Sequence, residues 1–402
     1  MTTPLDYAPA SDWTKPGLLA RQTLALLTDA VRRLQAAKLF WLSLGLSLLV
    51  AAMFGLVGIN DAGLTFPIYG QLDQALFNTQ FLDADVFYKL LFVGLGVKVW
   101  LAWAAIILAL ISTADLIPSL LADGSADLYL SRPVGRVRLL LTRYVTALLF
   151  VAAQSTCFAV ASLVVIGLRG GVWVPGVLWA VPMIVLLFSF LYCVSALVGL
   201  LTRSPVAAIL ATLLIWFVSW AVDVSDQGVL GQLMEQRVLV EDLEFDAKAN
   251  AALQARLGNA GEIARATAAG NGQAITDRLS QRQAEADRWE SAHDIIMMVK
   301  APLPKTGETV AVLERRLIAA ADLEDLADGF EAESIERSRA RAERRERDPN
   351  EAADRARARQ AGAARAEEAY KERSLGWSLG TSLLLQTVLV GLCCWRFARR
   401  DL

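Results

Sequence analysis

Residues 89–112 read KLLFVGLGVKVWLAWAAIILALIS, and Lys98 is the only charged side chain after the first position of this stretch. About 20 apolar residues in an α-helix cross the roughly 30 Å hydrocarbon core of a bilayer. The stretch is therefore expected to be a transmembrane helix, and similar apolar runs recur along the chain. The predicted spans are residues 39–59, 89–112, 139–168, 173–201, 205–222 and 376–397.

The overall composition also favours burial in lipid. Hydrophobic residues make up 55% of the 402-residue chain, whereas soluble globular proteins contain about 45–50%. The formal net charge is -2, but the charged residues are gathered between residues 226 and 373. This segregation predicts a membrane-embedded part and a polar part that lies outside the bilayer.

The short loops predict the orientation of the spans, because Lys and Arg are enriched in cytoplasmic loops. One topology places the basic residues of the N-terminus, the loop after the second span, the turn after the fourth span and the C-terminal tail on the same side. Both termini are then cytoplasmic, and the protein is expected in the cytoplasmic (inner) membrane as a multi-pass protein. The basic residues concerned are Lys38, Arg132, Arg136, Arg138, Arg143, Arg203, Arg396, Arg399 and Arg400.

This topology predicts an all-α polytopic membrane protein with six transmembrane helices and a large external helical insertion between the fifth and the sixth. Residues 1–38 form a cytoplasmic N-terminus, in which Gly17–Lys38 has the apolar stripe of an amphipathic interfacial helix. The alternative for this segment is a cytosolic helix packed on a partner. Residues 39–225 carry the first five spans, and residues 374–402 contain the sixth span and a basic cytoplasmic tail.

Residues 226–373 are predicted to form the extracytoplasmic helical, charged domain, because they are rich in Ala, Glu, Arg, Leu and Gln, which favour helices. The alternative is a solvated helical cap without a ligand of its own. Within this region Leu303–Gly307 reads LPKTG and fits a sortase sorting pattern. A sorting signal is followed directly by an apolar span, whereas charged residues follow here. We therefore interpret the segment as a turn before a helix that begins near Glu308.

The chain carries no signature of an enzyme. It lacks a GxxxxGK[ST] phosphate loop, so it is not a P-loop ATPase by itself. His293 is the only histidine, which disfavours a histidine metal site or a Ser/His/Asp triad. All four cysteines lie within predicted spans, which disfavours a disulfide framework. We expect no metal, no cofactor and no nucleic-acid partner for this chain.

Lys98 is a candidate functional residue inside the membrane. An ionisable side chain within a span costs about 2.5–3.5 kcal/mol on insertion scales unless it finds a partner or a cavity. Lys98 has no acidic residue within four positions along the sequence. Its side chain therefore either extends along its stem toward the headgroups or faces the interior of an assembly, and the sequence leaves both open.

A polar hairpin, residues 113–138, separates the second and third spans. The turn Asp123-Gly124-Ser125 divides two short helical segments, and SRPVGR at residues 131–136 combines a fixed backbone angle at Pro133 with arginines on either side. Such a segment suits docking into a groove of another protein. A positive-inside loop is the alternative, and the residues alone do not decide between them.

Two motifs resemble those of type-2 ABC transporter permeases. Residues 123–150 read DGSADLYLSRPVGRVRLLLTRYVTALLF, which resembles the family's segment between the second and third spans, with its "sRPvsR" turn and "lllgKY"-like entry to the next helix. The ending WRFARRDL resembles the family's terminal "F.rRDL". Two departures are the Arg143–Tyr144 pair in place of lysine and an aromatic residue, and an insertion of about 150 residues where the family has a short re-entrant helix pair.

The resemblance implies the membrane subunit of an ABC exporter that works as a homodimer or with a paired permease. ATP and magnesium would then bind a separate ATPase subunit, with the hairpin docked against it. The alternative hypothesis is a non-transporting membrane anchor or sensor whose external helical domain binds a partner. A secondary transporter is disfavoured because paired acids within the spans and an internal repeat are absent from the sequence. The residues expected to contact the ATPase are Asp123, Asp127, Tyr129, Ser131, Arg132, Pro133 and Arg136.

Overall fold

The protein is a multi-pass helical membrane protein, as the sequence predicts. In the computed structural model, six helices are long and apolar enough to cross a membrane within the described part of the chain. These are Lys38–Leu56, Val86–Leu121, Arg136–Arg169, Pro175–Thr202, Pro205–Arg256 and Leu379–Ala398. The structure describes residues 16–60, 63–66, 70–73, 84–121, 135–256, 262–317, 349–372 and 375–399.

The chain divides into two compact units. Unit one comprises Met1–Phe217, Thr306–Phe330 and Ser382–Leu402, and unit two comprises Val218–Lys305 and Glu331–Thr381. The division falls at Val218, whereas the sequence places the start of the polar insertion at residue 226. Residues 306–330 belong to unit one although they lie within the predicted insertion. That the insertion is external stays a prediction.

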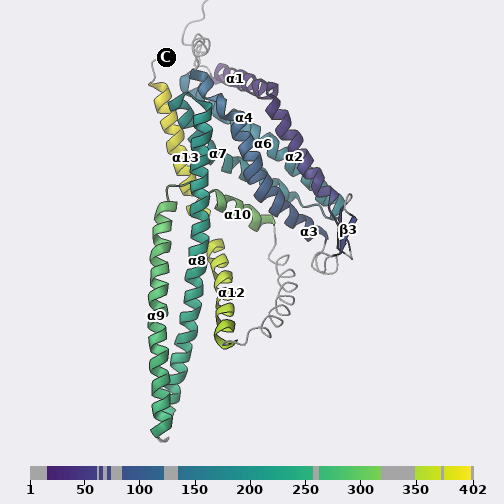
Figure 1. The fold of residues 1–402 in the computed structure, drawn as a ribbon. Coiled ribbons are helices and arrows are strands. Elements are labelled where there is room, and N and C mark those ends of the chain that lie inside the picture. The colour runs from purple at the N-terminus through teal and green to yellow at the C-terminus, as the bar shows by residue number, and fades with distance from the viewer. Residues whose placement is uncertain are drawn as a thin grey trace, which may run out of the picture. The chain divides into compact units, whose positions relative to one another are not determined.

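Unit one is built around α6, the longest of its own helices. It packs against α1, α2 and α7, and Figure 1 shows α2 and α6 running close to each other. The elements of this unit are α1 (Pro16–Ala36), α2 (Lys38–Leu56), α3 (Ala84–Leu91), η2 (Phe92–Ala105), α4 (Ile106–Thr113), η3 (Ala114–Leu116), η4 (Pro118–Leu121), α6 (Arg136–Arg169), η5 (Pro175–Trp179), α7 (Ala180–Thr202), α10 (Thr306–Leu317), the first part of α8 (Pro205–Arg256) and most of α13 (Leu375–Ala398).

Small and hydroxylated side chains line the buried face of α6. Ala147, Ser155, Ala159 and Ser162 recur at helical spacing and are nearly inaccessible. Helices in membranes approach one another closely through small residues, because lipid offers no hydrophobic force that drives helices together. This composition explains why α6 accepts three neighbouring helices at once.

The second span is not a regular α-helix. Its middle part, η2, is a π-helix of 14 residues between α3 and α4. A Cβ atom at Gly96 would lie 3.1 Å from the rings of both Phe54 and Phe158, so glycine leaves room for close packing where η2 meets α2 and α6. The sequence predicts a span here but not its hydrogen-bond register, because an apolar run is compatible with either helix type.

A small antiparallel sheet, not predicted from the sequence, follows the first span, and its first strand takes up the last two residues of the predicted span 39–59. Its strands are β1 (Gly58–Asn60), β2 (Gly63–Phe66) and β3 (Gly70–Asp73), in the order β1-β2-β3. Ile59 pairs with Leu64, which in turn pairs with Leu72. The Asn60 side chain accepts a hydrogen bond from the backbone of Gly63 at 3.0 Å, which closes the first hairpin. Strands this short carry too little periodic pattern to be recognised in the sequence.

The described residues of unit two form three long helices and the first turns of α13. The part of α8 from Val218 onward lies antiparallel to α9 (Glu262–Lys300). The Arg237 guanidinium lies 3.2 Å from the Glu290 carboxylate, and the Gln254 amide donates to the carbonyl of Ala268 at 2.8 Å. The partner on α9 moves to a lower residue number as the partner on α8 moves to a higher one, so the two helices are antiparallel.

The third helix, α12 (Pro349–Glu372), lies parallel to α8. Arg359 contacts Glu235 at 3.3 Å and Arg365 contacts Glu241 at 2.8 Å, so the partners advance together along both helices. Between them, a Cβ atom at Gly362 would come within 2.6 Å of the Glu235 backbone. Glycine therefore permits a backbone-to-backbone approach that any larger residue would prevent.

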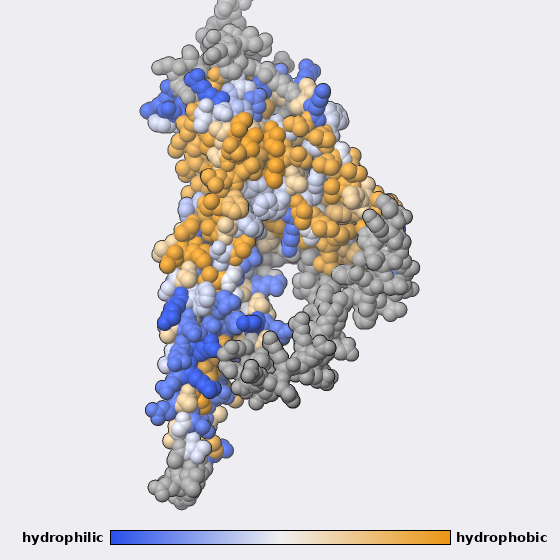
Figure 2. Space-filling model, in the orientation of Figure 1, coloured by the Kyte–Doolittle hydropathy of each residue, from blue (hydrophilic) through white to orange (hydrophobic). Residues whose placement is uncertain are grey.

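The two units differ in the character of their surfaces. On the face shown in Figure 2, hydrophobic side chains cover most of the described surface of unit one, and hydrophilic side chains cover much of that of unit two. Exposed large hydrophobic side chains are frequent on the spans of unit one other than the fourth, which exposes them only at its two ends. A surface of this kind requires lipid as its surroundings, which agrees with the six spans.

Candidate functional site

The polar hairpin is described only at its two flanks. Of the residues expected to contact an ATPase, Asp123, Asp127, Tyr129, Ser131, Arg132 and Pro133 lie outside the described residues. Arg136 is the first residue of α6 and is half-buried. The flanks are η3 with η4 on one side and the first turns of α6 on the other, and their contacts show what the hairpin is attached to.

The first flank is anchored on α7. The Tyr192 hydroxyl donates a hydrogen bond to the carbonyl of Thr113 at 3.3 Å. Ile117 is buried, and Pro118 packs so closely on Gly199 that a Cβ atom there would lie 3.0 Å from the proline ring. Gly199 therefore lets Pro118 pack closely against α7.

The second flank is anchored on two helices at once. The Tyr144 hydroxyl of α6 donates to the carbonyl of Ser189 in α7 at 3.0 Å and accepts from the Gln386 amide of α13 at 3.3 Å. The Ser189 hydroxyl lies 3.0 Å from the other atom of the same amide, Oε1. This polar triad links the start of α6 to the fourth and sixth spans. The sequence gives no sign of it, because the partners lie far apart along the chain.

A buried arginine follows the hairpin directly. Arg143 is almost inaccessible, and its guanidinium lies 4.0 Å from the carboxylate of Asp29 in α1. A buried charge is costly unless an opposite charge lies close to it. The pair therefore helps to hold α1 against α6. The sequence predicts α1 as an interfacial helix but not this contact. The position of α1 in the headgroup layer stays a prediction.

Lys98 is exposed on η2, so it does not point into the core of unit one. An exposed position agrees with a side chain that extends toward the headgroups and also with one that faces a second subunit. Both alternatives from the sequence therefore remain.

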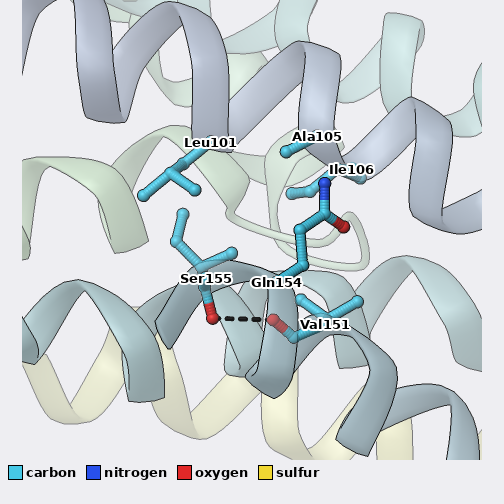
Figure 3. Close-up of a pocket in the computed structure, with 7 residues that line it drawn as sticks. Leu101, Ala105, Ile106, Val151, Gln154 and Ser155 are labelled. Atoms are coloured by element: carbon cyan, nitrogen blue, oxygen red, sulfur yellow. Dashed lines mark hydrogen bonds between the residues drawn. The ribbon is translucent and has the colours of Figure 1, made fainter. Parts of the chain in front are cut away.

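A second polar feature lies inside unit one, between η2, α4, α6 and α7. Gln154 is 2% exposed, and neither atom of its amide has a hydrogen-bond partner. It lines a small pocket with Leu101, Ala105, Ile106, Val151, Ser155 and Ile184. Figure 3 shows the amide directed toward Ala105 and Ile106, while the Ser155 hydroxyl bonds to the carbonyl of Val151. Gln154 is the only glutamine of the third span, which is the signal that could have singled it out.

Replacing Gln154 with leucine is expected to stabilise the protein by about 1–3 kcal/mol, because a buried amide without a partner costs about that much. The melting temperature in detergent should rise for Gln154→Leu. Ser155→Ala serves as the control, since the Ser155 hydroxyl already has its partner. A lower melting temperature for Gln154→Leu than for Ser155→Ala would contradict this expectation.

Unit two contains a buried charged cluster that sequence reasoning missed. The Lys300 ammonium lies 2.8 Å from a carboxylate oxygen of Asp223 and 2.8 Å from one of Asp226. His293 Nε2 lies 3.4 Å from the other oxygen of Asp226, and the ring of Tyr370 lies 5.5 Å from the ammonium. The cluster joins α8, α9 and α12. Its signal in the sequence is the spacing of the two aspartates, which places them on one face of α8 just after the fifth span.

The first three residues of LPKTG, Leu303–Lys305, belong to a turn before a helix, as predicted, whereas Thr306 and Gly307 already belong to that helix. Residues 301–305 connect α9 to α10, which begins at Thr306. Lys305 is buried, with its ammonium 3.5 Å from the centre of the Trp377 ring and in contact with the Thr381 hydroxyl. This lysine is thus part of the packing between the end of α9 and the start of α13.

Comparison of the chain with family models, curated proteins and solved structures gives no match. In the described part of the chain, no three His, Cys, Asp or Glu side chains are placed to hold a metal ion. Functional conclusions therefore rest on the chain's own residues and geometry.

Proposed function

We propose that this protein is the membrane-spanning subunit of an ABC transporter, acting as an exporter and coupled to a separate ATPase subunit. The observation that carries the proposal is the attachment of the polar hairpin. Its two flanks contact α7 and α13, through Tyr192 on one side and through the Tyr144 triad on the other. A segment attached in this way is suited to pass a displacement to several spans.

The motif resemblance supports the same role. The hairpin carries the "sRPvsR"-like turn and enters α6 at Arg136. In the proposed mechanism an ATPase binds this turn, and closure of the ATPase on ATP moves the hairpin. The movement reaches α7 and α13 through the triad, and the spans alternate between inward-facing and outward-facing states. ATP and magnesium bind the partner subunit only, and two membrane subunits form the complete transporter.

A photo-crosslinking amino acid in place of Tyr129 tests the docking directly. We expect it to form an adduct with a protein that also binds an ATP analogue. Trp173, which is exposed in the turn between the third and fourth spans, is the control position, because the proposed topology places it on the opposite side. An adduct with an ATP-binding protein from position 173 but not from position 129 would overturn the proposal.

Tyr144→Phe is expected to reduce the rate of ATP hydrolysis by the complex several-fold without releasing the ATPase. The substitution removes only the hydroxyl that links α6 to α7 and α13, at a cost of about 1 kcal/mol in stability. Tyr88→Phe is the matched control, since the Tyr88 hydroxyl donates to the carbonyl of Val57 at 2.7 Å, away from the hairpin. Equal rates for the two variants would argue against transmission through the triad.

A further inference from the structure

Near its end α9 buries Lys300 against α8 and exposes large hydrophobic side chains, while Asp294 on the same stretch is exposed as well. Lys300 is 2% exposed, Asp223 5% and Asp226 0%. On the same stretch of α9, Ile295 is 63% exposed and Met298 76%. A helical hairpin in water shows the opposite arrangement, because charged groups are rarely buried and apolar groups rarely gather on the surface.

The charged cluster shows which part of α8 lies beside the exposed hydrophobic side chains of α9. The contacts of His293 and Lys300 with Asp226 and Asp223 set residues 293–300 of α9 alongside residues 223–226 of α8. At this level α8 exposes Val224, and α9 exposes Val299 next to Met298. Figure 2 shows hydrophobic side chains over this end of α9. We call Val224, Ile295, Met298 and Val299 the apolar collar.

The collar continues a lipid-facing stripe along α8. Exposed apolar side chains recur along one face of this helix from Val206 to Val224, and the next exposed large hydrophobic side chain of α8 is Phe245. From Val206 to Val224 the helix advances by 18 residues, which is about 27 Å at 1.5 Å per residue. This length is close to the roughly 30 Å thickness of the hydrocarbon core. The members of the stripe are Val206, Leu210, Leu214, Phe217, Trp220 and Val224. The level of the collar is therefore the level at which the fifth span ends.

We propose that the collar contacts the lipid bilayer, so that the last two turns of α9 lie at the boundary between the acyl chains and the headgroups. The helix is not itself a span; it meets the membrane surface beside α8 with Lys300 facing α8, and the exposed Asp294 is left to the headgroup layer. Burial of Lys300 between Asp223 and Asp226 is what allows this end of α9 to face lipid, since an exposed ammonium there would draw the helix toward water. The proposal does not depend on transport or on an ATPase.

The test uses the full-length protein in lipid nanodiscs, where both membrane faces are accessible. The thiol introduced by Met298→Cys is expected to react at least tenfold more slowly with a membrane-impermeant maleimide than the thiol introduced by Phe245→Cys. Phe245 is the matched control, because it is 73% exposed on α8 but lies far from the charged cluster along the helix. The unmodified protein supplies the background from the native cysteines. Ile295→Cys gives an independent second position on the same face.

A bimane fluorophore on the same thiols then identifies what protects them. Lipids brominated in the acyl chains should quench bimane at positions 298 and 295 and leave bimane at position 245 unaffected. Fast maleimide labelling at both collar positions would overturn the proposal. Slow labelling without quenching would overturn it as well, because the collar would then be covered by protein, either a second copy of this chain or another partner.

Discussion

Replacement of Lys300 by methionine is expected to destabilise unit two by about 3–5 kcal/mol, because it leaves two carboxylates buried without the ammonium between them. Asp223 and Asp226 are almost inaccessible and lie 2.8 Å from that ammonium. Hydrogen exchange of the backbone amides of residues 290–300 is the measurement, since it reports local opening. The exchange rate there should rise about 100-fold or more.

Arg237→Met is the matched control for this experiment. Arg237 also joins α8 to α9, through Glu290 at 3.2 Å, but both side chains are about half-exposed. Exposed ion pairs contribute about 0–1 kcal/mol, so this variant should exchange nearly as the unmodified protein does. Asparagine at both Asp223 and Asp226 should restore much of the protection lost in Lys300→Met. Equal effects of Lys300→Met and Arg237→Met would show that the buried cluster does not hold the helices together.

Changing Arg132, Pro133 and Arg136 together to alanine is expected to release the ATPase. Each charged hydrogen bond contributes about 1.5–3 kcal/mol, so the loss of two arginines corresponds to a fall in affinity of at least 100-fold. Loss of Pro133 also frees the backbone of the turn. Titration of the ATPase onto the membrane subunit in nanodiscs measures the change in the dissociation constant.

The control for this variant removes two other basic residues assigned to the cytoplasmic side, Arg32 and Lys38, both of which are exposed. Their replacement by alanine separates a specific docking contact from a general loss of positive charge. The hairpin variant should lose binding, and the control should retain it. An unchanged affinity of the hairpin variant would remove the hairpin from the docking surface.

The spans were predictable from the sequence, because crossing a bilayer requires a length and a composition that a single segment shows by itself. The predicted residues 39–59 and 139–168 correspond to Lys38–Leu56 and Arg136–Arg169. The π-helical middle of the second span was not predictable, because an apolar run is compatible with the hydrogen bonds of an α-helix and of a π-helix alike. The helical character of α9 and α12 was expected from their composition, but their directions relative to α8 depend on side-chain pairs.

The candidate site was predictable only in part, for the same physical reason. The hairpin is a local pattern of turn residues and arginines, so the sequence identifies it. The contacts that attach it are long-range: Tyr144 meets Ser189 and Gln386, which are 45 and 242 positions away. The cluster at Lys300 joins residues 74 positions apart. A single sequence shows the residues of such sites, but it does not show which of them contact one another.

The most direct test of the central claim is purification of the intact protein from its source in a mild detergent, followed by identification of the proteins that remain bound and by an ATP hydrolysis assay. We expect a stoichiometric ATP-binding subunit and magnesium-dependent hydrolysis, both lost when Arg132, Pro133 and Arg136 are changed together. An intact, correctly folded protein that purifies without any ATPase would contradict the account.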